Sequence, residues 1–152
     1  MKKFLIKITL RLHNFLYRVI SKLAIEKGIH KKHSLMNYHQ FFVDNVSSSD
    51  FVLDVGCGNG FLSYDMAKKA EEVTGIDIER REIKFKRDNL RFIFSDALSY
   101  DFKDRFDVIV LSNVLEHIEK RQEFLTKIKK LAPKILIRVP MLNRDWISLY
   151  KK

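Results

Sequence analysis

The chain has 152 residues, 46% of them hydrophobic, which is the size and composition of one globular domain with a sizeable core. Lys and Arg number 29 against 19 Asp and Glu, a formal net charge of +10, and residues 1–40 alone hold nine of the bases and one of the acids. The single cysteine excludes an internal disulfide and the five histidines have no zinc-binding spacing, so we expect no metal site and a reducing, cytoplasmic compartment.

The first 27 residues predict a basic amphipathic helix. Charges interrupt every apolar run well short of the roughly 20 residues that a membrane span needs, and no signal-peptide core follows the first lysines. Two roles stay open: packing on the rest of the domain, or peripheral contact of residues 1–27 with an anionic membrane. Apolar and basic side chains both recur at steps of three or four, at Phe4, Ile8, Leu12, Leu16, Val19 and Leu23 and at Lys7, Arg11, Arg18 and Lys22.

An unusually polar segment follows the glycine at residue 28 that ends this helix. Residues 30–39 hold three histidines, two lysines and Tyr38. One interpretation is an exposed linker that turns into a helix carrying Phe41 and Phe42. The other is a segment that lines a ligand pocket, for which Tyr38 and His39 are the candidates.

The stretch FVLDVGCGNGF, residues 51–61, is the centre of the predicted domain. A short apolar run bounded by turn residues is typical of a strand buried on both faces of a parallel sheet, and Asp54 falls near its carboxyl end. Gly56, Gly58 and Gly60 allow a sharp turn and the close approach of a ligand before helical spacing begins. In such a strand, loop and helix, ligands bind beyond the carboxyl end of the strand.

The rest of the chain repeats the alternation of strand and connection. Strands are predicted in EEVTGIDIE, which ends near Asp77, in LRFIFSDALSY, which ends near Asp96, in FDVIVLSNVLEHI and in KILIRVP. A short helix is predicted between Asp77 and Asp96, and a crossover helix in EKRQEFLTKIKKLA. This order predicts an α/β fold with a doubly wound, mostly parallel sheet over residues 47–152, preceded by a helical arm and lid segment in residues 1–46.

The glycine spacing separates two classes of ligand. A dinucleotide fold has the pattern G-x-G-x-x-G, and Phe61 at the third glycine position disfavours a nicotinamide-dependent oxidoreductase. Asp77 follows at the distance at which a carboxylate holds a ribose diol. The motif DVGCGNG, the acids ending the second and third strands, and NVLEH after the fourth strand together resemble class I S-adenosylmethionine-dependent methyltransferases. The resemblance implies a Rossmann-like methyltransferase domain.

The resemblance implies S-adenosylmethionine as the cofactor and assigns roles to individual residues. It places Asp77 on the ribose, Asp96 on the adenine amino group and the backbone of Asn113 near the methionine amine. Ile78 would pack against the adenine face, a buried core position being its alternative, and Cys57 would act through its backbone rather than its thiol. The predicted cofactor-binding residues are Asp54, Gly56, Cys57, Gly58, Gly60, Asp77, Ile78, Asp96, Ala97 and Asn113.

Methyl transfer mainly requires that the acceptor be held about 3 Å from the methyl carbon. Where the acceptor is a hydroxyl, His117 with Glu116 is the best-placed pair to take its proton, because both follow the fourth strand. The alternative is that these two residues cap or pack the next helix.

We therefore expect a cytoplasmic methyltransferase that acts on a small-molecule or lipid-linked acceptor, peripheral at the inner face of the membrane if the arm binds lipid, with nucleic acid an unlikely partner. The family usually continues past the fifth strand into a helix and an antiparallel hairpin, whereas only MLNRDWISLYKK follows Pro140 here. The alternative is thus a truncated S-adenosylmethionine-binding or interaction module without turnover. The fifth strand would be an apolar edge, so self-association through it is expected.

Overall fold

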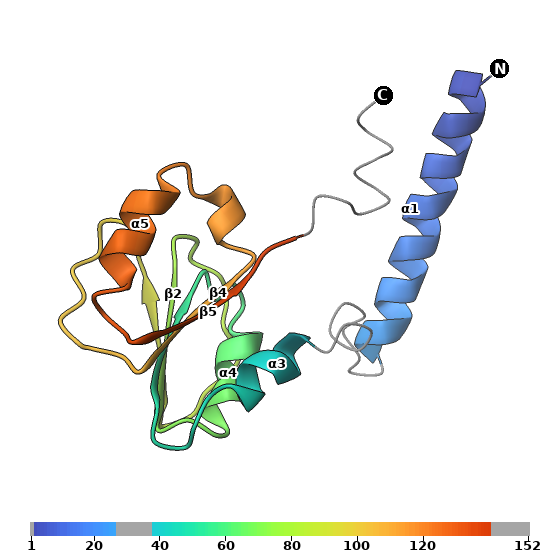
Figure 1. The fold of residues 1–152 in the computed structure, drawn as a ribbon. Coiled ribbons are helices and arrows are strands. Elements are labelled where there is room, and N and C mark those ends of the chain that lie inside the picture. Colours follow the sequence, from blue (N-terminus) through green and yellow to red (C-terminus); the bar gives the residue numbers. More distant parts are fainter. Residues whose placement is uncertain (1, 27–37, 141–152) are drawn as a thin grey trace. The chain divides into compact units, whose positions relative to one another are not determined.

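The computed structural model describes residues 2–26 and 38–140, which belong to two compact units that divide between residues 40 and 41. The first unit contains one long helix, α1 (Lys2–Glu26), as the sequence predicted (Figure 1). Every α1 side chain that the structure describes is exposed. Within the described ranges, no helix combines the length and the apolarity that crossing a membrane requires.

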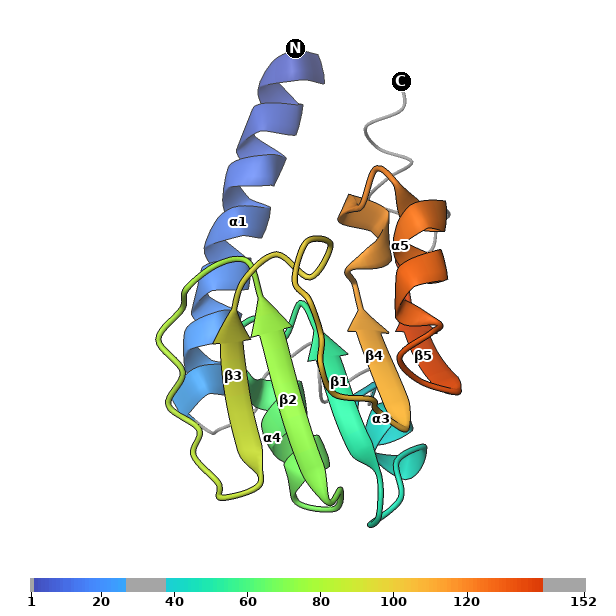
Figure 2. The ribbon, with the colours of Figure 1, turned by 90° about the vertical axis from the view of Figure 1, so that its left-hand side faces the viewer.

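The second unit is built on a sheet of five parallel strands in the order β3-β2-β1-β4-β5 (Figure 2). The chain runs from the central strand to one edge and then returns through β4 to the other edge, so the predicted doubly wound topology is confirmed. The carboxyl ends of β1 and β4 form the switch point of this topology. The strands are β1 (Phe51–Val55), β2 (Glu72–Asp77), β3 (Leu90–Phe94), β4 (Val108–Ser112) and β5 (Lys134–Arg138).

Helices cover both faces of the sheet (Figures 1 and 2). The helix after β1, α4 (Phe61–Ala67), packs on β2 and β3, and α3 (Tyr38–Asp44) precedes β1. The opposite face carries α5 (Arg121–Ile128), the predicted crossover helix, which follows the short 3-10 helix η1 (Leu115–His117). The core beneath α5 includes Leu53, Val55, Ile76, Ile109, Leu111, Phe124 and Ile128.

The connection from β2 to β3 differs from the prediction, because residues 80–87 are extended and contain no helix. Ile83 and Phe85 are half-buried, whereas the lysines next to them are exposed. The ring of Phe85 lies 4.6 Å from that of Phe61 and 4.9 Å from that of Tyr64, both on α4. An alternation with period two suits an extended chain, and ring packing on α4 holds it there.

The outer strand β5 leaves apolar side chains exposed. Among the described residues it pairs only with β4, through a register that places Ile137 opposite Leu111. Ile137 is 42% exposed and Val139 48% exposed, while Ile135 is half-buried against the core. The described part of the domain thus has the apolar edge that the sequence predicted.

Candidate functional site

The glycine loop, residues 56–60, lies beyond the carboxyl end of β1. The N–H groups of Gly56 and Cys57 donate to the carbonyl of Ile76 at 2.7 and 3.2 Å, which holds the loop against β2. Gly56, Gly58 and Gly60 have φ values of 69°, 59° and 80°, in the left-handed region that favours glycine. Gly60 is the N-cap residue of α4, so the loop leads directly into that helix.

The three loop glycines differ in the space around them. A Cβ at Gly56 would lie 2.4 Å from the side chain of Val114, and one at Gly60 would lie 2.7 Å from the ring of Phe92. Packing therefore explains these two glycines. A Cβ at Gly58 would meet nothing within 4 Å, so Gly58 is the position at which the loop backbone is open to a ligand.

Asp54 and Cys57 are buried beside the loop. The hydroxyl of Ser63, on α4, donates to Asp54 Oδ2 at 2.6 Å. Burial raises the pKa of Asp54 to about 7; the Ser63 hydrogen bond opposes the shift and the charge of Asp77 adds to it. Burial, with the Asp54 charge, also raises the pKa of the Cys57 thiol, so this thiol stays protonated and unreactive at neutral pH.

Asp77 ends β2 next to the loop. Its Oδ2 accepts a hydrogen bond from the Gly58 N–H at 2.7 Å, and its Oδ1 accepts one from the Glu79 N–H at 2.9 Å. Each carboxylate oxygen keeps acceptor capacity, so both can still receive a ligand hydroxyl. Ile78 is 73% exposed, which excludes the alternative of a buried core position.

Asp96 follows β3 and begins a tight turn. The Ser95 N–H donates to the Asp77 carbonyl at 2.9 Å, so the ends of β2 and β3 stay together. Asp96 Oδ1 accepts the Leu98 N–H at 2.9 Å, whereas its Oδ2 accepts no hydrogen bond from the described residues. Ala97 lies within the same turn. The two acids therefore stand at adjacent strand ends, and one oxygen of Asp96 is available to a ligand.

The polar turn after β4 carries the remaining predicted residues. Asn113 has a φ of 59°, the one left-handed residue other than glycine in the described part of the chain, and its N–H donates to the Arg138 carbonyl at 2.8 Å. His117 is exposed at the end of η1. Glu116 Oε2 is buried and has no hydrogen-bond partner among the described residues. The backbone carbonyl of Glu116 accepts a hydrogen bond from the Arg121 side chain at 3.2 Å, which links η1 to α5.

Tyr38 and His39 begin α3 and belong to the first unit. The side chain of Tyr38 lies outside the described part of the structure, and His39 is half-buried. Their place in a pocket stays a prediction. Among the described residues, no three potential metal-ligating side chains gather in one place.

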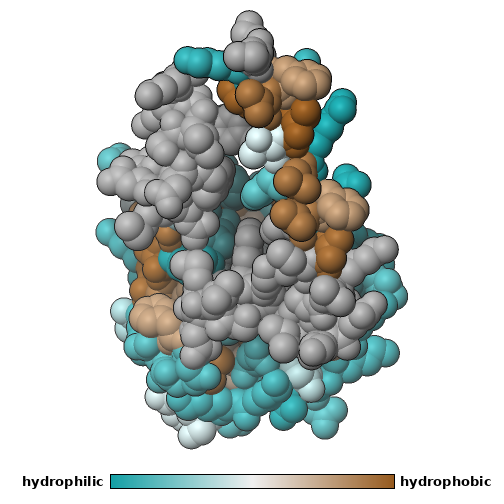
Figure 3. Space-filling view, turned by 90° about the vertical axis from the view of Figure 1, so that its right-hand side faces the viewer, coloured by the Kyte–Doolittle hydropathy of each residue, from teal (hydrophilic) through white to brown (hydrophobic). Residues whose placement is uncertain are grey.

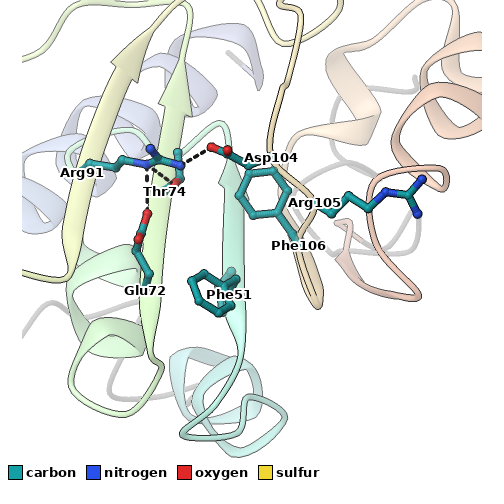
Figure 4. Close-up of a pocket in the computed structure, with 8 residues that line it drawn as sticks. Phe51, Glu72, Thr74, Arg91, Asp104, Arg105 and Phe106 are labelled. Atoms are coloured by element: carbon teal, nitrogen blue, oxygen red, sulfur yellow. Dashed lines mark hydrogen bonds and ion pairs between the residues drawn. The ribbon is translucent and has the colours of Figure 1, made fainter.

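A cavity of about 320 Å³ lies elsewhere, at the amino ends of the strands (Figure 4). Arg91 crosses it, donating to Thr74 Oγ1 at 2.7 Å and pairing with Glu72 at 3.1 Å and Asp104 at 2.6 Å. Since ligands of open α/β sheets bind at the carboxyl ends, and since these charges already compensate one another, this cavity is separate from the predicted site.

Phe92 is the residue of this region that the sequence analysis missed. A Cβ at Gly60 or at Gly75 would lie 2.7 Å from an atom of the Phe92 ring, so the ring packs directly against both glycines. A glycine inside a strand often marks such a close approach, so Gly75 within the second predicted strand was the available signal.

A doubly wound sheet with an open glycine loop at its switch point, followed by acids at two adjacent strand ends, is the architecture of a domain that binds a nucleotide-type cofactor. The family model described as "Methyltransferase domain" matches residues 47–138, and the chain belongs to this family. The predicted family is thereby confirmed.

The curated relatives match this chain over only part of their own length. The chain is 34% identical over 106 residues to "Ubiquinone biosynthesis O-methyltransferase" of Psychrobacter cryohalolentis, covering 62% of this chain and 41% of that protein. It is 33% identical over 121 residues to the protein of the same name from Bartonella tribocorum, covering 70% of this chain and 49% of the relative. The chain thus spans less than half the length of these relatives.

Solved structures share the fold at low sequence identity. The N-methyltransferase NodS from Bradyrhizobium japonicum, solved with S-adenosyl-L-homocysteine, matches with a TM-score of 0.52 and 19% identity over 67% of this chain and 55% of its own. A Burkholderia thailandensis 1,6-didemethyltoxoflavin-N1-methyltransferase matches with a TM-score of 0.57 and 16% identity over 80% of this chain and 59% of its own.

Proposed function

We propose that this chain binds S-adenosylmethionine at the carboxyl ends of β1, β2 and β3 and transfers the methyl group to a small-molecule or lipid-linked acceptor. The observation that carries the proposal is the open, left-handed Gly58, whose N–H is bonded to the carboxylate of Asp77 at 2.7 Å. A backbone without a neighbouring Cβ, next to a carboxylate, suits a ligand that joins an amino acid to a ribose. Membership in the methyltransferase family supports the same function.

The acids that end β2 and β3 would hold the nucleoside. Asp77 accepts hydrogen bonds from the ribose hydroxyls, and Asp96 Oδ2 accepts one from the adenine amino group. The exposed Ile78 covers the adenine ring, and the backbone of Ala97 borders it. The backbone of Asn113 lies near the methionine amine. A domain division into an arm and lid of residues 1–46 and a cofactor-binding domain of residues 47–152 belongs to this proposal.

When bound, S-adenosylmethionine supplies a methyl group on a sulfonium, so the leaving group requires no acid. The protein's task is to orient the acceptor and to receive its proton. The relatives' name, O-methyltransferase, favours a hydroxyl acceptor. His117 takes the proton of that hydroxyl through its exposed imidazole, with Glu116 beside it, and Tyr38 and His39 border the acceptor.

Calorimetric titration with S-adenosylhomocysteine and, separately, with NADH tests the cofactor. We expect binding of the first and none of the second. The substitution Asp77→Asn, and more strongly Asp77→Ala, should weaken S-adenosylhomocysteine binding by about 1.5–3 kcal/mol, the scale of hydrogen bonds to a charged group. The control is Asp101→Asn, an exposed acid paired with Lys103. Preference for NADH would overturn the proposal.

The second candidate function is a cofactor-binding module without turnover. The apolar β5 edge, with Ile137 42% exposed, favours it because such an edge suits contact with another strand. Binding of S-adenosylhomocysteine with no methyl transfer to phenolic or lipid-linked hydroxyl acceptors would select this alternative.

We further propose that α1 contacts an anionic membrane surface from the cytoplasmic side. Seven of its exposed apolar side chains share one face, and brown residues follow the helix in Figure 3; Ile6 and Leu10 are also exposed, but they lie on the other side. At 3.6 residues per turn, the seven side chains fall within an arc of about 120°, and Lys7, Arg11 and Arg18 lie next to one border of that arc. Members of this apolar arc are Phe4, Leu5, Ile8, Leu12, Phe15, Leu16 and Val19, each 38–68% exposed.

The occupant that fits this face is a lipid surface with negative headgroups. The arc supplies apolar area, and residues 1–40 supply a net charge of +8 from nine bases and one acid. Interfacial helices combine these two features, and the charge contribution falls as salt rises. Packing of α1 against protein is the competing outcome.

Vesicle co-sedimentation of the full chain tests this contact. We expect binding to phosphatidylcholine vesicles that contain phosphatidylserine, weaker binding at high salt, and little binding to phosphatidylcholine alone. Leu12→Asn, within the apolar arc, should reduce binding, whereas Leu10→Asn, on the other side of the helix and 43% exposed, should not. Equal recovery with both vesicle types, or none with either, would contradict the membrane contact.

A further inference from the structure

Lys127 reaches from α5 to the turn that begins at Asp96. Its ammonium group donates to three carbonyl oxygens, those of Ala97 at 3.1 Å, Leu98 at 2.6 Å and Tyr100 at 2.8 Å. A lysine has three donors, and all three are used here. The same nitrogen lies 5.7 Å from the ring centroid of Phe102, a further favourable contact for the cation.

The turn itself resembles the start of a helix that does not continue. The Asp96 carbonyl accepts the N–H groups of Ser99 and Tyr100 at 3.1 and 2.9 Å. No helix follows within residues 101–107, so the next carbonyls have no backbone donors ahead of them. Lys127 supplies those donors and takes the place of the missing turn.

This arrangement fixes one side chain in particular. Asp96 uses Oδ1 to accept the Leu98 N–H at 2.9 Å, and the Leu98 carbonyl is held by Lys127. With Oδ1 and the turn both held, rotation of the carboxylate is restricted, and Oδ2 accepts no hydrogen bond from the described residues. Lys127 therefore acts on Asp96 through the backbone of the turn.

We propose that Lys127 is a positioning residue for adenine recognition, holding the 96–100 turn so that Asp96 Oδ2 meets the exocyclic amino group of the ring. This inference rests on the proposed function, since it names how one part of that site is set. Lys127 does not touch the cofactor. It is thus a determinant of base specificity rather than a catalytic residue.

The test compares S-adenosylhomocysteine with S-inosylhomocysteine, which carries an oxygen in place of the adenine amino group. We expect the wild-type chain to prefer the adenosyl ligand, and Lys127→Met to reduce that preference by about tenfold, the scale of one hydrogen bond to a charged group. A merely stabilising role would lower both affinities together and leave their ratio unchanged.

Lys129→Met is the matched control, because Lys129 is exposed and its side chain makes no hydrogen bond among the described residues. Lys127→Arg, which keeps the charge and several donors, should retain most of the preference. Lys127→Gln should reduce the preference for the adenosyl ligand by an intermediate amount, and it replaces Lys127→Met in the test if Lys127→Met does not fold.

An unchanged ratio in folded Lys127→Met or Lys127→Gln would overturn this inference, as would equal binding of both ligands by the wild type. Failure of the wild type to bind either ligand would instead overturn the proposed function. The two results are distinguished in the same titrations.

Discussion

Gly56 and Gly58 share a positive φ but differ in their surroundings, and substitution should separate packing from binding. Gly56→Ala places a Cβ 2.4 Å from Val114, so we expect the free energy of unfolding to fall by about 2–4 kcal/mol from overpacking and strain. Gly58→Ala meets no neighbour within 4 Å and should cost about 1–2 kcal/mol from its backbone conformation alone.

Urea unfolding and titration with S-adenosylhomocysteine measure the two effects. Gly58→Ala should fold and bind at least tenfold more weakly, because its methyl group enters the space kept for the ligand. If Gly58→Ala binds as well as the wild type, the open position is not where the cofactor lies.

Asp54 should make stability depend on pH. Its pKa is raised by burial from the ordinary 3.8 to about 7. Below about pH 4 the carboxyl is protonated in both states, and between about pH 4 and 7 the unfolded chain ionises while the folded chain does not. The difference in unfolding free energy between wild type and Asp54→Asn should therefore fall by roughly 3–5 kcal/mol over this range and stay constant above it.

Chemical unfolding of both proteins at a series of pH values measures this difference. Subtracting one unfolding free energy from the other cancels the titration of all groups that the two proteins share. Asp101→Asn, at an exposed acid, is the control. A difference that stays flat from pH 4 to 8 would show that Asp54 titrates normally in the folded chain.

At the scale of elements, Phe85 should hold the extended β2–β3 connection on α4. Phe85→Ala removes ring contacts at 4.6 and 4.9 Å, and we expect a loss of about 1–2 kcal/mol, less than for a fully buried ring. Lys84→Ala, at an exposed neighbour, should change stability by less than about 0.5 kcal/mol. Thermal unfolding compares the two, and equal small effects would mean that the connection is not anchored by this ring.

The strands were predictable from the sequence because each is a short apolar run that ends at a turn residue or an acid. The positions of the glycine loop and of Asp77 at strand ends were predictable from the same local pattern, while their role in cofactor binding stays a proposal. The β2–β3 connection was not predictable, because its many charged residues also suit a helix, and the rings that hold Phe85, those of Phe61 and Tyr64, lie 24 and 21 residues earlier in the chain. Lys127 was beyond prediction too, since its three acceptors are backbone atoms that no side-chain pattern reveals.

At the scale of the molecule, β5 should mediate self-association. Ile137 and Val139 are 42% and 48% exposed on a strand that pairs, among the described residues, only with β4. Such an edge tends to recruit a second strand, here from another copy of this chain. Light scattering should detect association at high concentration, and Ile137→Lys should reduce it while circular dichroism stays unchanged. A well-folded wild-type monomer at high concentration would contradict this expectation.

The ring of Phe92 has a consequence for how the sheet assembles. It sits opposite Gly75 in the β2–β3 register and fills the space beside Gly60, which lies more than 30 residues earlier in the chain. A shift of β3 by two residues in one direction would bring the smaller Leu90 side chain to that place, and a shift by one residue would turn Phe92 to the other face of the sheet. The Phe92 ring therefore helps to set the register of β3 against β2. The glycine loop therefore reaches its final packing only when β3 pairs with β2 in this register, so completion of the ligand site depends on a contact between segments that are distant in the chain.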